Sequence, residues 1–311
     1  MPGKKKNKKY EDEYDFDFEE EEYEDEYDED EEYDDEEEPR RKKRHSAGDI
    51  ILTIVLFVAF CIFAYAAYNL FHIYTEYKKG SDEYNAIAEM AVTEKEPDQK
   101  KTKKNQGEIT PALVAPMSID FASLRAVNDD VIGWIYMEAI EDINYPMVRG
   151  IDNNYYLHQT YQRNYNFAGT IFVDMANSDD LNDCNTIIYG HNMKNGSMFG
   201  QLKDYSASLE PYNTSKYFWI FTPEYDYRYE IISAYTTQVN SVTYTLFKGP
   251  GQEFLDYLNT IVGLSDIPTT PGTLSVNDKV VTLSTCTNDE STRYVVQGKR
   301  VDTIRKTGTG S

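Results

Sequence analysis

Cys286 is the side chain whose type and setting best suit covalent chemistry in this sequence. It ends the apolar run VVTLSTC and precedes a polar segment, so it lies where a predicted strand meets a loop. A thiolate is an effective nucleophile when a nearby base or cation favours it and a hydrogen-bond donor stabilises the oxyanion that forms. A disulfide with Cys184 and simple packing of a buried thiol are the alternatives for Cys286, whereas Cys61 lies in an apolar run.

A base and a cation are available at similar positions. His191 ends the run TIIYGH, whereas His158 lies in NNYYLHQTY, interpreted as a surface helix or loop. Arg293 starts a strand that six residues, 287–292, connect to the strand ending near Cys286. An antiparallel pair of this kind sets the Cα atoms of Cys286 and Arg293 about 5 Å apart. Singly, His191 fits an ordinary loop residue and Arg293 a surface charge; together the three predict a thiol, an acid–base group and an oxyanion donor.

These side chains need a scaffold that brings strand ends together. Runs of β-branched and aromatic residues predict strands at 132–137, 143–148, 168–173, 186–189, 217–221, 227–236, 279–285 and 293–301. Pro146 favours an edge position for the second of them. Helices are expected over 121–128 and 253–262. Many strands with few helices favour a barrel or a sandwich.

Charge is unevenly distributed along the 311 residues. Residues 11–38 hold 22 acidic and no basic side chains, and residues 1–44 carry −12 of the formal charge of −23. So many like charges without aliphatic residues predict a disordered acidic tail over residues 1–49, with a basic cluster next to the apolar run. Docking of a basic partner and tyrosine phosphorylation are alternative roles for the tail. The acidic balance argues against a nucleic-acid-binding protein, which needs a basic surface.

A single transmembrane helix is predicted at residues 50–74. This run of 25 residues contains no Asp, Glu, Lys or Arg, and about 20 residues cross the hydrocarbon layer. No small-x-small cleavage site follows it, which argues against a removed signal peptide. The five cations at 40–44 predict a cytoplasmic N-terminus and an extracellular C-terminal part. The expected order after the span is a stalk, 75–112, with a short helix over 83–90, a catalytic domain, 113–305, and a flexible C-terminus, 306–311.

Several segments together resemble class B sortases. The signature is TLSTC followed by RYVVQGK, and NTIIYGHNMKNGSMFGQL is similar to the histidine segment of that class. DVIGWI, INYPMVRG, DNNYYL and AGTIFVD follow the family order, and the resemblance covers residues 113–303. It implies an eight-stranded sortase β-barrel with N-terminal helices and one helix, 253–262, before the penultimate core strand. It also implies a membrane-anchored cysteine transpeptidase of a Gram-positive cell surface.

The resemblance also implies roles for individual residues. Cys286 is then the nucleophile, His191 the general acid and base, and Arg293 the group that stabilises the oxyanion and the substrate carbonyl. The residues that match substrate-binding positions are Ser284, Thr285, Tyr189, Asn153, Leu157, Tyr244 and Leu246.

The expected partners follow from the same resemblance. They are exported proteins with a C-terminal sorting motif, and an amine of a peptidoglycan precursor or a pilin lysine. The chemistry needs neither a metal nor a cofactor, so none is expected. A pilin polymerase of the same fold, a hydrolytic cysteine protease and a non-catalytic membrane-tethered binding domain are the alternative functions.

Overall fold

The barrel predicted from the sequence is present. The computed structural model describes residues 46–95 and 113–306, so the predicted tail up to residue 45 and the residues after 306 lie outside the described residues. Within 113–306 the chain forms a closed barrel with the strand order β10-β8-β7-β3-β4-β5-β6-β9. Pairing of β9 with β10 closes it. The prediction of a mainly β, eight-stranded barrel is confirmed.

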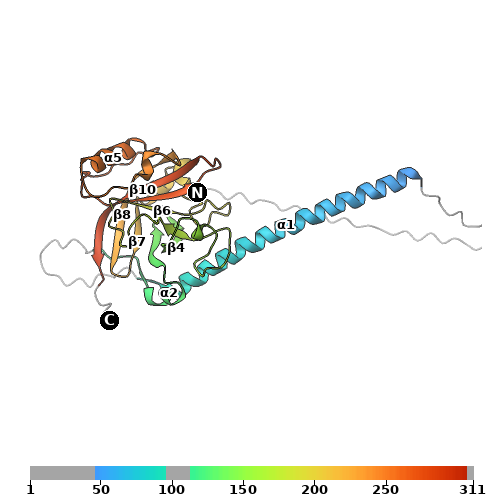
Figure 1. The fold of residues 1–311 in the computed structure, drawn as a ribbon, viewed down its shortest axis with the longest axis horizontal. Helices are drawn as coiled ribbons and strands as arrows, with labels where there is room; N and C mark the ends of the chain where they lie inside the picture. Colours follow the sequence, from blue (N-terminus) through green and yellow to red (C-terminus); the bar gives the residue numbers. More distant parts are fainter. Residues whose placement is uncertain (1–45, 96–112, 307–311) are drawn as a thin grey trace, which may run out of the picture. The chain divides into compact units, whose positions relative to one another are not determined.

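Strands of three to fourteen residues and mostly short helices make up the domain (Figure 1). The barrel strands are β3 (Val131–Met137), β4 (Ile140–Val148), β5 (Ile171–Val173), β6 (Asn185–Tyr189), β7 (Tyr217–Phe221), β8 (Tyr225–Gln238), β9 (Val280–Cys286) and β10 (Thr292–Arg305). A separate antiparallel pair consists of β1 (Val92–Glu94) and β2 (Met117–Ile119). The helices are α1 (Ala47–Ala91), α2 (Phe121–Val127), α3 (Asp204–Ala207), α4 (Glu210–Thr214), α5 (Gln252–Gly263) and the 3-10 turns η1 (Tyr155–Leu157) and η2 (Val242–Tyr244).

Three adjacent strands position the predicted catalytic residues. Strand β6 runs parallel to β9, with Tyr189 opposite Ser284, so both strands end on the same side of the barrel. Strand β10 is antiparallel to β9 and starts there, with Arg293 opposite Cys286. The predicted pairing of Cys286 with Arg293 is therefore confirmed.

The expectation that Pro146 marks an edge strand is wrong. Strand β4 pairs with β3 on one side and with β5 on the other. The partners of β5 are Met147 and Val148 only, so the register leaves Pro146 without a β5 partner. A proline has no N–H to donate, and this short ladder therefore tolerates it inside a closed barrel.

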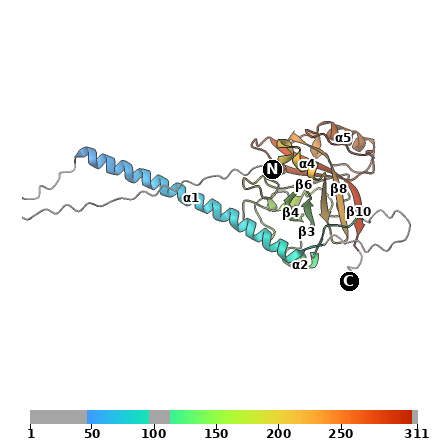
Figure 2. The ribbon, with the colours of Figure 1, turned by 180° about the vertical axis from the view of Figure 1, so that it is seen from behind.

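Helix α5 precedes the penultimate strand, as predicted, and buries one face. Phe254, Tyr257, Leu258 and Ile261 recur at helical spacing and pack against a second apolar cluster that draws on β8, β9 and β10. Figures 1 and 2 show α5 and α2 on opposite sides of the barrel. Cys184 is buried in the same cluster, and both Cys184 and Cys286 are free thiols.

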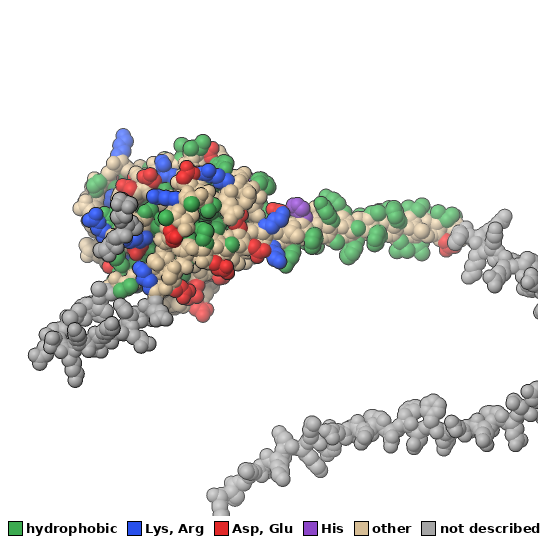
Figure 3. All heavy atoms as spheres, turned by 90° about the horizontal axis from the view of Figure 1, so that it is seen from below, with side chains coloured by type: hydrophobic (Ala, Val, Ile, Leu, Met, Phe, Trp, Pro, Cys, Tyr) green, Lys and Arg blue, Asp and Glu red, His purple; other side chains and the backbone are tan. Residues whose placement is uncertain are grey.

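Helix α1 contains the predicted transmembrane segment. Among the described residues it is the helix long and apolar enough to cross a membrane. Its hydrophobic side chains between residues 50 and 74 are exposed, and Figure 3 shows them along the helix face in view. Exposed apolar side chains over this length suit a lipid environment and not water.

The predicted stalk is wrong for residues 75–94, although the short helix predicted over 83–90 is present as part of α1. Helix α1 continues to Ala91, and β1 then pairs with β2. Tyr84 is buried, donates a hydrogen bond to the carbonyl oxygen of Gly169 at 2.6 Å and packs edge-on against Tyr145. Lys78, Lys79, Asp82 and Glu89 are exposed, and these charges close in sequence concealed the apolar face. This segment is thus part of the folded domain; residues 96–112 lie outside the described residues.

Candidate active site

A cleft of about 220 Å³ lies where β6 and β9 end and β10 begins. It is lined by Asn153, Leu157, Phe172, Tyr189, Gly190, His191, Ser284, Thr285, Cys286 and Arg293. The fold therefore gathers the three predicted catalytic residues with five of the seven predicted substrate-binding residues. These come from segments more than a hundred residues apart in sequence.

Cys286 lies between the two other predicted catalytic residues. The β6–β9 ladder ends at the pair Tyr189 and Ser284, and His191 and Cys286 each follow two residues later. Neighbouring strands are about 4.8 Å apart, so the imidazole and the thiol extend from adjacent backbones. Arg293 flanks the thiol from the β10 side. Cys286 is half-buried, which leaves its sulfur accessible from the cleft.

His191 has a defined tautomer when it is neutral. Its Nε2 lies 2.8 Å from the carbonyl oxygen of Leu157. A carbonyl oxygen only accepts hydrogen bonds, so Nε2 must carry the proton. Nδ1 is then the nitrogen with a free lone pair. Burial holds the pKa of His191 below its usual value, and the Leu157 carbonyl only partly opposes this shift.

His158 lies on an exposed surface, as predicted, and its ring lies beside this site. Its exposed ring stacks on His191, with ring centroids 6.0 Å apart and planes 24° apart. A second positive charge at this distance would disfavour the imidazolium form of His191, and it further lowers the pKa of that residue. The position of His158 directly after Leu157 is the signal that could have identified it.

Replacing His158 by alanine should raise the pKa of His191. The substitution removes a positive neighbour and also uncovers one ring face, and both changes favour the imidazolium form. NMR titration of the histidine Cε1–H signals measures this pKa. A Cys286→Ala background keeps the thiol from titrating beside the imidazole.

A His158→Phe protein is the matched control, because it keeps a ring over His191 and removes only the charge. An unchanged pKa of His191 in both proteins would contradict the expected coupling.

The lowered pKa of His191 also affects the stability of the fold. Just below about pH 6.5 the folded chain binds fewer protons at His191 than the unfolded chain does. The free energy of unfolding should therefore decrease as the pH falls through that window.

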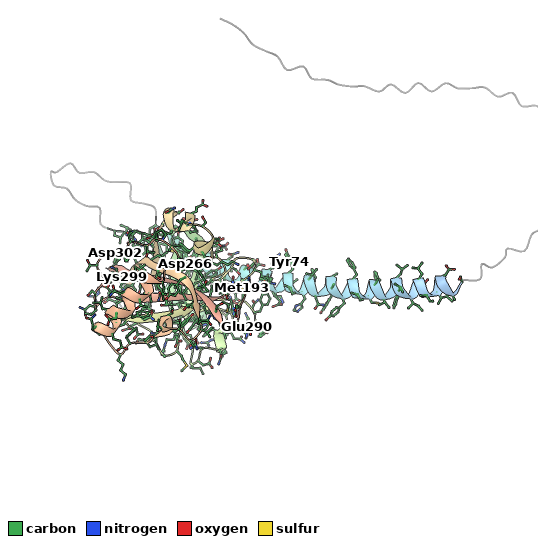
Figure 4. All side chains as sticks on the ribbon, turned by 90° about the horizontal axis from the view of Figure 1, so that it is seen from above. Tyr74, Met193, Asp266, Glu290, Lys299 and Asp302 are labelled. Carbon is green, nitrogen blue, oxygen red and sulfur yellow. The ribbon has the colours of Figure 1, made fainter. Side chains whose placement is uncertain are left out.

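The guanidinium of Arg293 is held by the β9–β10 connection. Its Nη1 donates to the carbonyl oxygens of Glu290 at 2.9 Å and Thr292 at 2.7 Å. Figure 4 labels Glu290 in this connection and Met193 in the loop that follows β6. Within the described residues, the hydrogen bonds of this guanidinium involve Nη1 alone. Nε and Nη2 thus have N–H groups to offer a substrate oxygen.

Asp174 organises the wall of the cleft, and the sequence analysis missed it. One carboxylate oxygen accepts hydrogen bonds from the Tyr189 hydroxyl at 2.9 Å and from Asn153 Nδ2 at 3.0 Å. Burial and this carboxylate raise the pKa of Tyr189, so its hydroxyl stays protonated and can keep donating. Asp174 ends the AGTIFVD segment, and its position at a strand end next to β6 is the signal that was not used.

Ser284 and Thr285 line the cleft, but their hydroxyls bond to protein. Ser284 Oγ lies 2.8 Å from the hydroxyl of Tyr244, so Tyr244 reaches the site from η2. Thr285 Oγ1 donates to the carbonyl oxygen of Gly190 at 2.8 Å. Thr285 is buried, so its contribution is to hold the β6 and β9 segments together.

Leu246 does not line this cleft, although it was predicted to contact substrate. The buried Thr243 fixes the preceding turn, because its carbonyl oxygen accepts from Tyr257 and Asn185. Past this anchor the chain turns outward, and Leu246 is 41% exposed beside the start of α5.

A thiol, an imidazole and a guanidinium thus lie together at the end of a closed eight-stranded barrel, which is the arrangement that the resemblance to sortases implies. The sequence matches the Sortase domain over residues 135–301. The chain belongs to the sortase family, and its relatives assign it to class B.

Relatives of known sequence and structure agree with this assignment. The chain is 36% identical to sortase B of Listeria monocytogenes over 187 residues, which cover 58% of this chain and 74% of the relative. It is 29% identical to sortase B of Staphylococcus aureus over 252 residues, covering 79% of this chain and 94% of the relative. The crystal structure of sortase B from Bacillus anthracis in complex with AAEK1 superimposes with a TM-score of 0.60 at 29% identity, covering 74% of this chain and 99% of that one.

The comparisons define the function at the level of the family. The protein is a sortase transpeptidase, an enzyme that acts on exported proteins with sorting motifs. They do not favour a pilin polymerase or a non-catalytic binding domain. The apolar segment of α1 fits a membrane-anchored, cell-surface enzyme.

Proposed function

We propose that Cys286, His191 and Arg293 carry out the transpeptidation. The Cys286 thiolate attacks the carbonyl carbon of the threonine in a C-terminal sorting motif, and an S–C bond forms while the carbonyl oxygen becomes an oxyanion. Arg293 donates to that oxygen from Nε or Nη2. The C–N bond then breaks, and the His191 imidazolium gives its Nδ1 proton to the leaving amine, which leaves a thioacyl-enzyme.

In the second half-reaction an amine attacks the thioester carbonyl. Neutral His191 takes a proton from the incoming amine at Nδ1, the C–N bond forms, and the Cys286 thiolate leaves. The acceptor in this proposal is an amine of a peptidoglycan precursor. The lowered pKa of His191 supports the base role, because neutral imidazole then predominates at neutral pH.

The strand register is the observation that carries this proposal. Cys286 lies directly opposite Arg293 on β10 and next to the segment of His191 beyond β6, in one cleft. Hydrogen bonds to Glu290, Thr292 and Leu157 hold the cation and the base. Groups held before the substrate arrives lower the barrier without further reorganisation.

The proposed topology has the N-terminus in the cytoplasm and the catalytic domain outside the cell. It is supported by the five cations before the apolar run and by the weaker positive bias after it. In this arrangement the exported substrates and the cell-wall amine lie on the same side of the membrane as Cys286.

A peptide assay on the full chain in detergent micelles tests the proposed reaction. A library of peptides ending in candidate sorting motifs is incubated with the enzyme, with and without a peptidoglycan stem peptide that carries a free amine. We expect cleavage after threonine and a ligated product when the amine is present. Mass spectrometry distinguishes the two products.

The other outcomes separate the alternatives. Free acid as the only product in the presence of the amine would identify a hydrolytic cysteine protease. Ligation to a pilin-derived lysine peptide but not to the stem peptide would identify a pilin polymerase. Absence of cleavage across the whole library would overturn the proposed reaction.

A further inference from the structure

Hydrogen bonds continue to join the histidine and cysteine segments beyond the end of the β6–β9 ladder. The N–H of Gly190 donates to the carbonyl oxygen of Ser284 at 3.1 Å, and Thr285 Oγ1 donates back to the carbonyl oxygen of Gly190 at 2.8 Å. The last bond comes from Asn192, whose Nδ2 donates to the carbonyl oxygen of Cys286 at 2.9 Å. The residue next to the base is thus bonded to the backbone of the nucleophile.

The segment that carries Asn192 is rigid on both sides. At Gly190 an added Cβ would lie 2.5 Å from the Ile171 side chain and 2.6 Å from the Phe199 ring, so the backbone there is tightly enclosed. After Asn192 the loop returns, and the N–H of Phe199 donates to the carbonyl oxygen of His191 at 3.0 Å. A bridge between Asn192 and Met198 closes this loop. A side chain held in this way can fix the distance between the histidine and cysteine segments that it joins.

The orientation of the Asn192 amide follows from its partner. A carbonyl oxygen only accepts, so the NH₂ group must face Cys286. The amide oxygen, Oδ1, is then buried, and it has no hydrogen-bond partner among the described residues. An unpaired buried acceptor is unfavourable for the fold. If Asn192 served only the stability of the fold, its amide oxygen would be expected to accept a hydrogen bond as well. The unpaired oxygen therefore points to a role for the hydrogen bond from Nδ2.

We propose that Asn192 is a positioning residue that fixes the separation of the Cys286 thiol from the His191 imidazole. The inference rests on the proposed thiol mechanism. In the first half-reaction His191 gives a proton to the amine that leaves the carbonyl carbon. In the second it takes a proton from the amine that attacks the same carbon. The two backbones must therefore keep their spacing while that carbon changes geometry. A displacement of about 1 Å in such a site costs about 100-fold in rate.

Asn192→Asp is the sharpest variant, because aspartate has the same shape and cannot donate to the Cys286 carbonyl. We expect kcat to fall about 30- to 100-fold, with KM within about twofold of the wild-type value. Asn192→Ala should lose kcat in the same way without introducing a charge. Alkylation of Cys286 by iodoacetamide, followed by peptide mass mapping, should remain complete, so that kcat can be expressed per reactive thiol.

Asn195→Ala is the matched control in the same loop. Asn195 accepts hydrogen bonds from Ser197 and makes none to the cysteine segment among the described residues. We expect its kcat to match the wild type. Wild-type kcat per thiol in both Asn192 variants would overturn the inference, and so would a loss that Asn195→Ala shares. A wild-type enzyme that neither cleaves nor ligates would instead overturn the proposed function.

Discussion

The Cys286→Ala protein should cleave and ligate sorting-motif peptides at least about 10⁴-fold more slowly than the wild type. The proposed route begins with an S–C bond, and alanine offers no nucleophile in its place. The remaining cleft can still bind and polarise a peptide, but it cannot form the thioacyl-enzyme. The measurement is the initial rate of fragment release, together with intact-protein mass spectrometry to detect the acylated enzyme.

Cys184→Ala is the control for this experiment. Cys184 is also a free thiol, but it is buried against α5, and burial raises its pKa. A buried thiol in such a place packs and does not react. We expect the control to keep the wild-type rate and the acylated intermediate. Substantial cleavage by Cys286→Ala would mean that another group is the nucleophile.

Replacing Arg293 by alanine should lower kcat about 10²- to 10³-fold and change KM little. The guanidinium is held through Nη1 before substrate arrives, so its other N–H groups can meet the oxyanion as the charge develops. Such an interaction is stronger in the transition state than with the bound substrate. Steady-state kinetics with the preferred peptide separate the two parameters.

Two further variants sharpen the Arg293 test. Arg293→Lys keeps the charge but lacks the planar guanidinium, which can bond to the loop carbonyls and to the substrate at the same time. It should therefore restore only a small part of the rate. Arg125→Ala removes an exposed arginine from α2 and should leave both parameters unchanged. A loss confined to KM in Arg293→Ala would assign Arg293 to substrate binding and not to oxyanion stabilisation.

Local spacing predicted part of this site without knowledge of the fold. The short connection between the last two strands was enough to set Cys286 opposite Arg293, because antiparallel neighbours have a register fixed by their turn. Local spacing did not predict the position of His191 relative to Cys286. Strands β6 and β9 are parallel and about ninety residues apart, and no spacing in the sequence specifies that pairing. There the family resemblance supplied the position of the histidine.

The stalk prediction failed because burial on one face of a helix was hidden by polar neighbours. Tyr84 sits among charged residues, so its segment was interpreted as a stalk although one face of the helix is buried. His158 is exposed, as predicted, but the stacking of its ring on His191 was not predicted. Leu246 matched a substrate-binding position of the family, whereas the structure places it outside the cleft, beside the start of α5. Each outcome depends on contacts between distant segments.

The continuation of α1 into the folded domain limits how the enzyme can be released from a membrane. Tyr84, Ile87 and Ala91 are core residues although they belong to the helix that contains the apolar segment. Proteolysis before Tyr77 would free a domain that keeps these side chains. A cut beyond Ala91 would remove them and open a cavity beside Tyr145, and each large buried side chain lost costs about 2–5 kcal/mol. Shedding at the cell surface would therefore yield either an intact soluble transpeptidase or a destabilised barrel, depending on where within one helix the chain is cleaved.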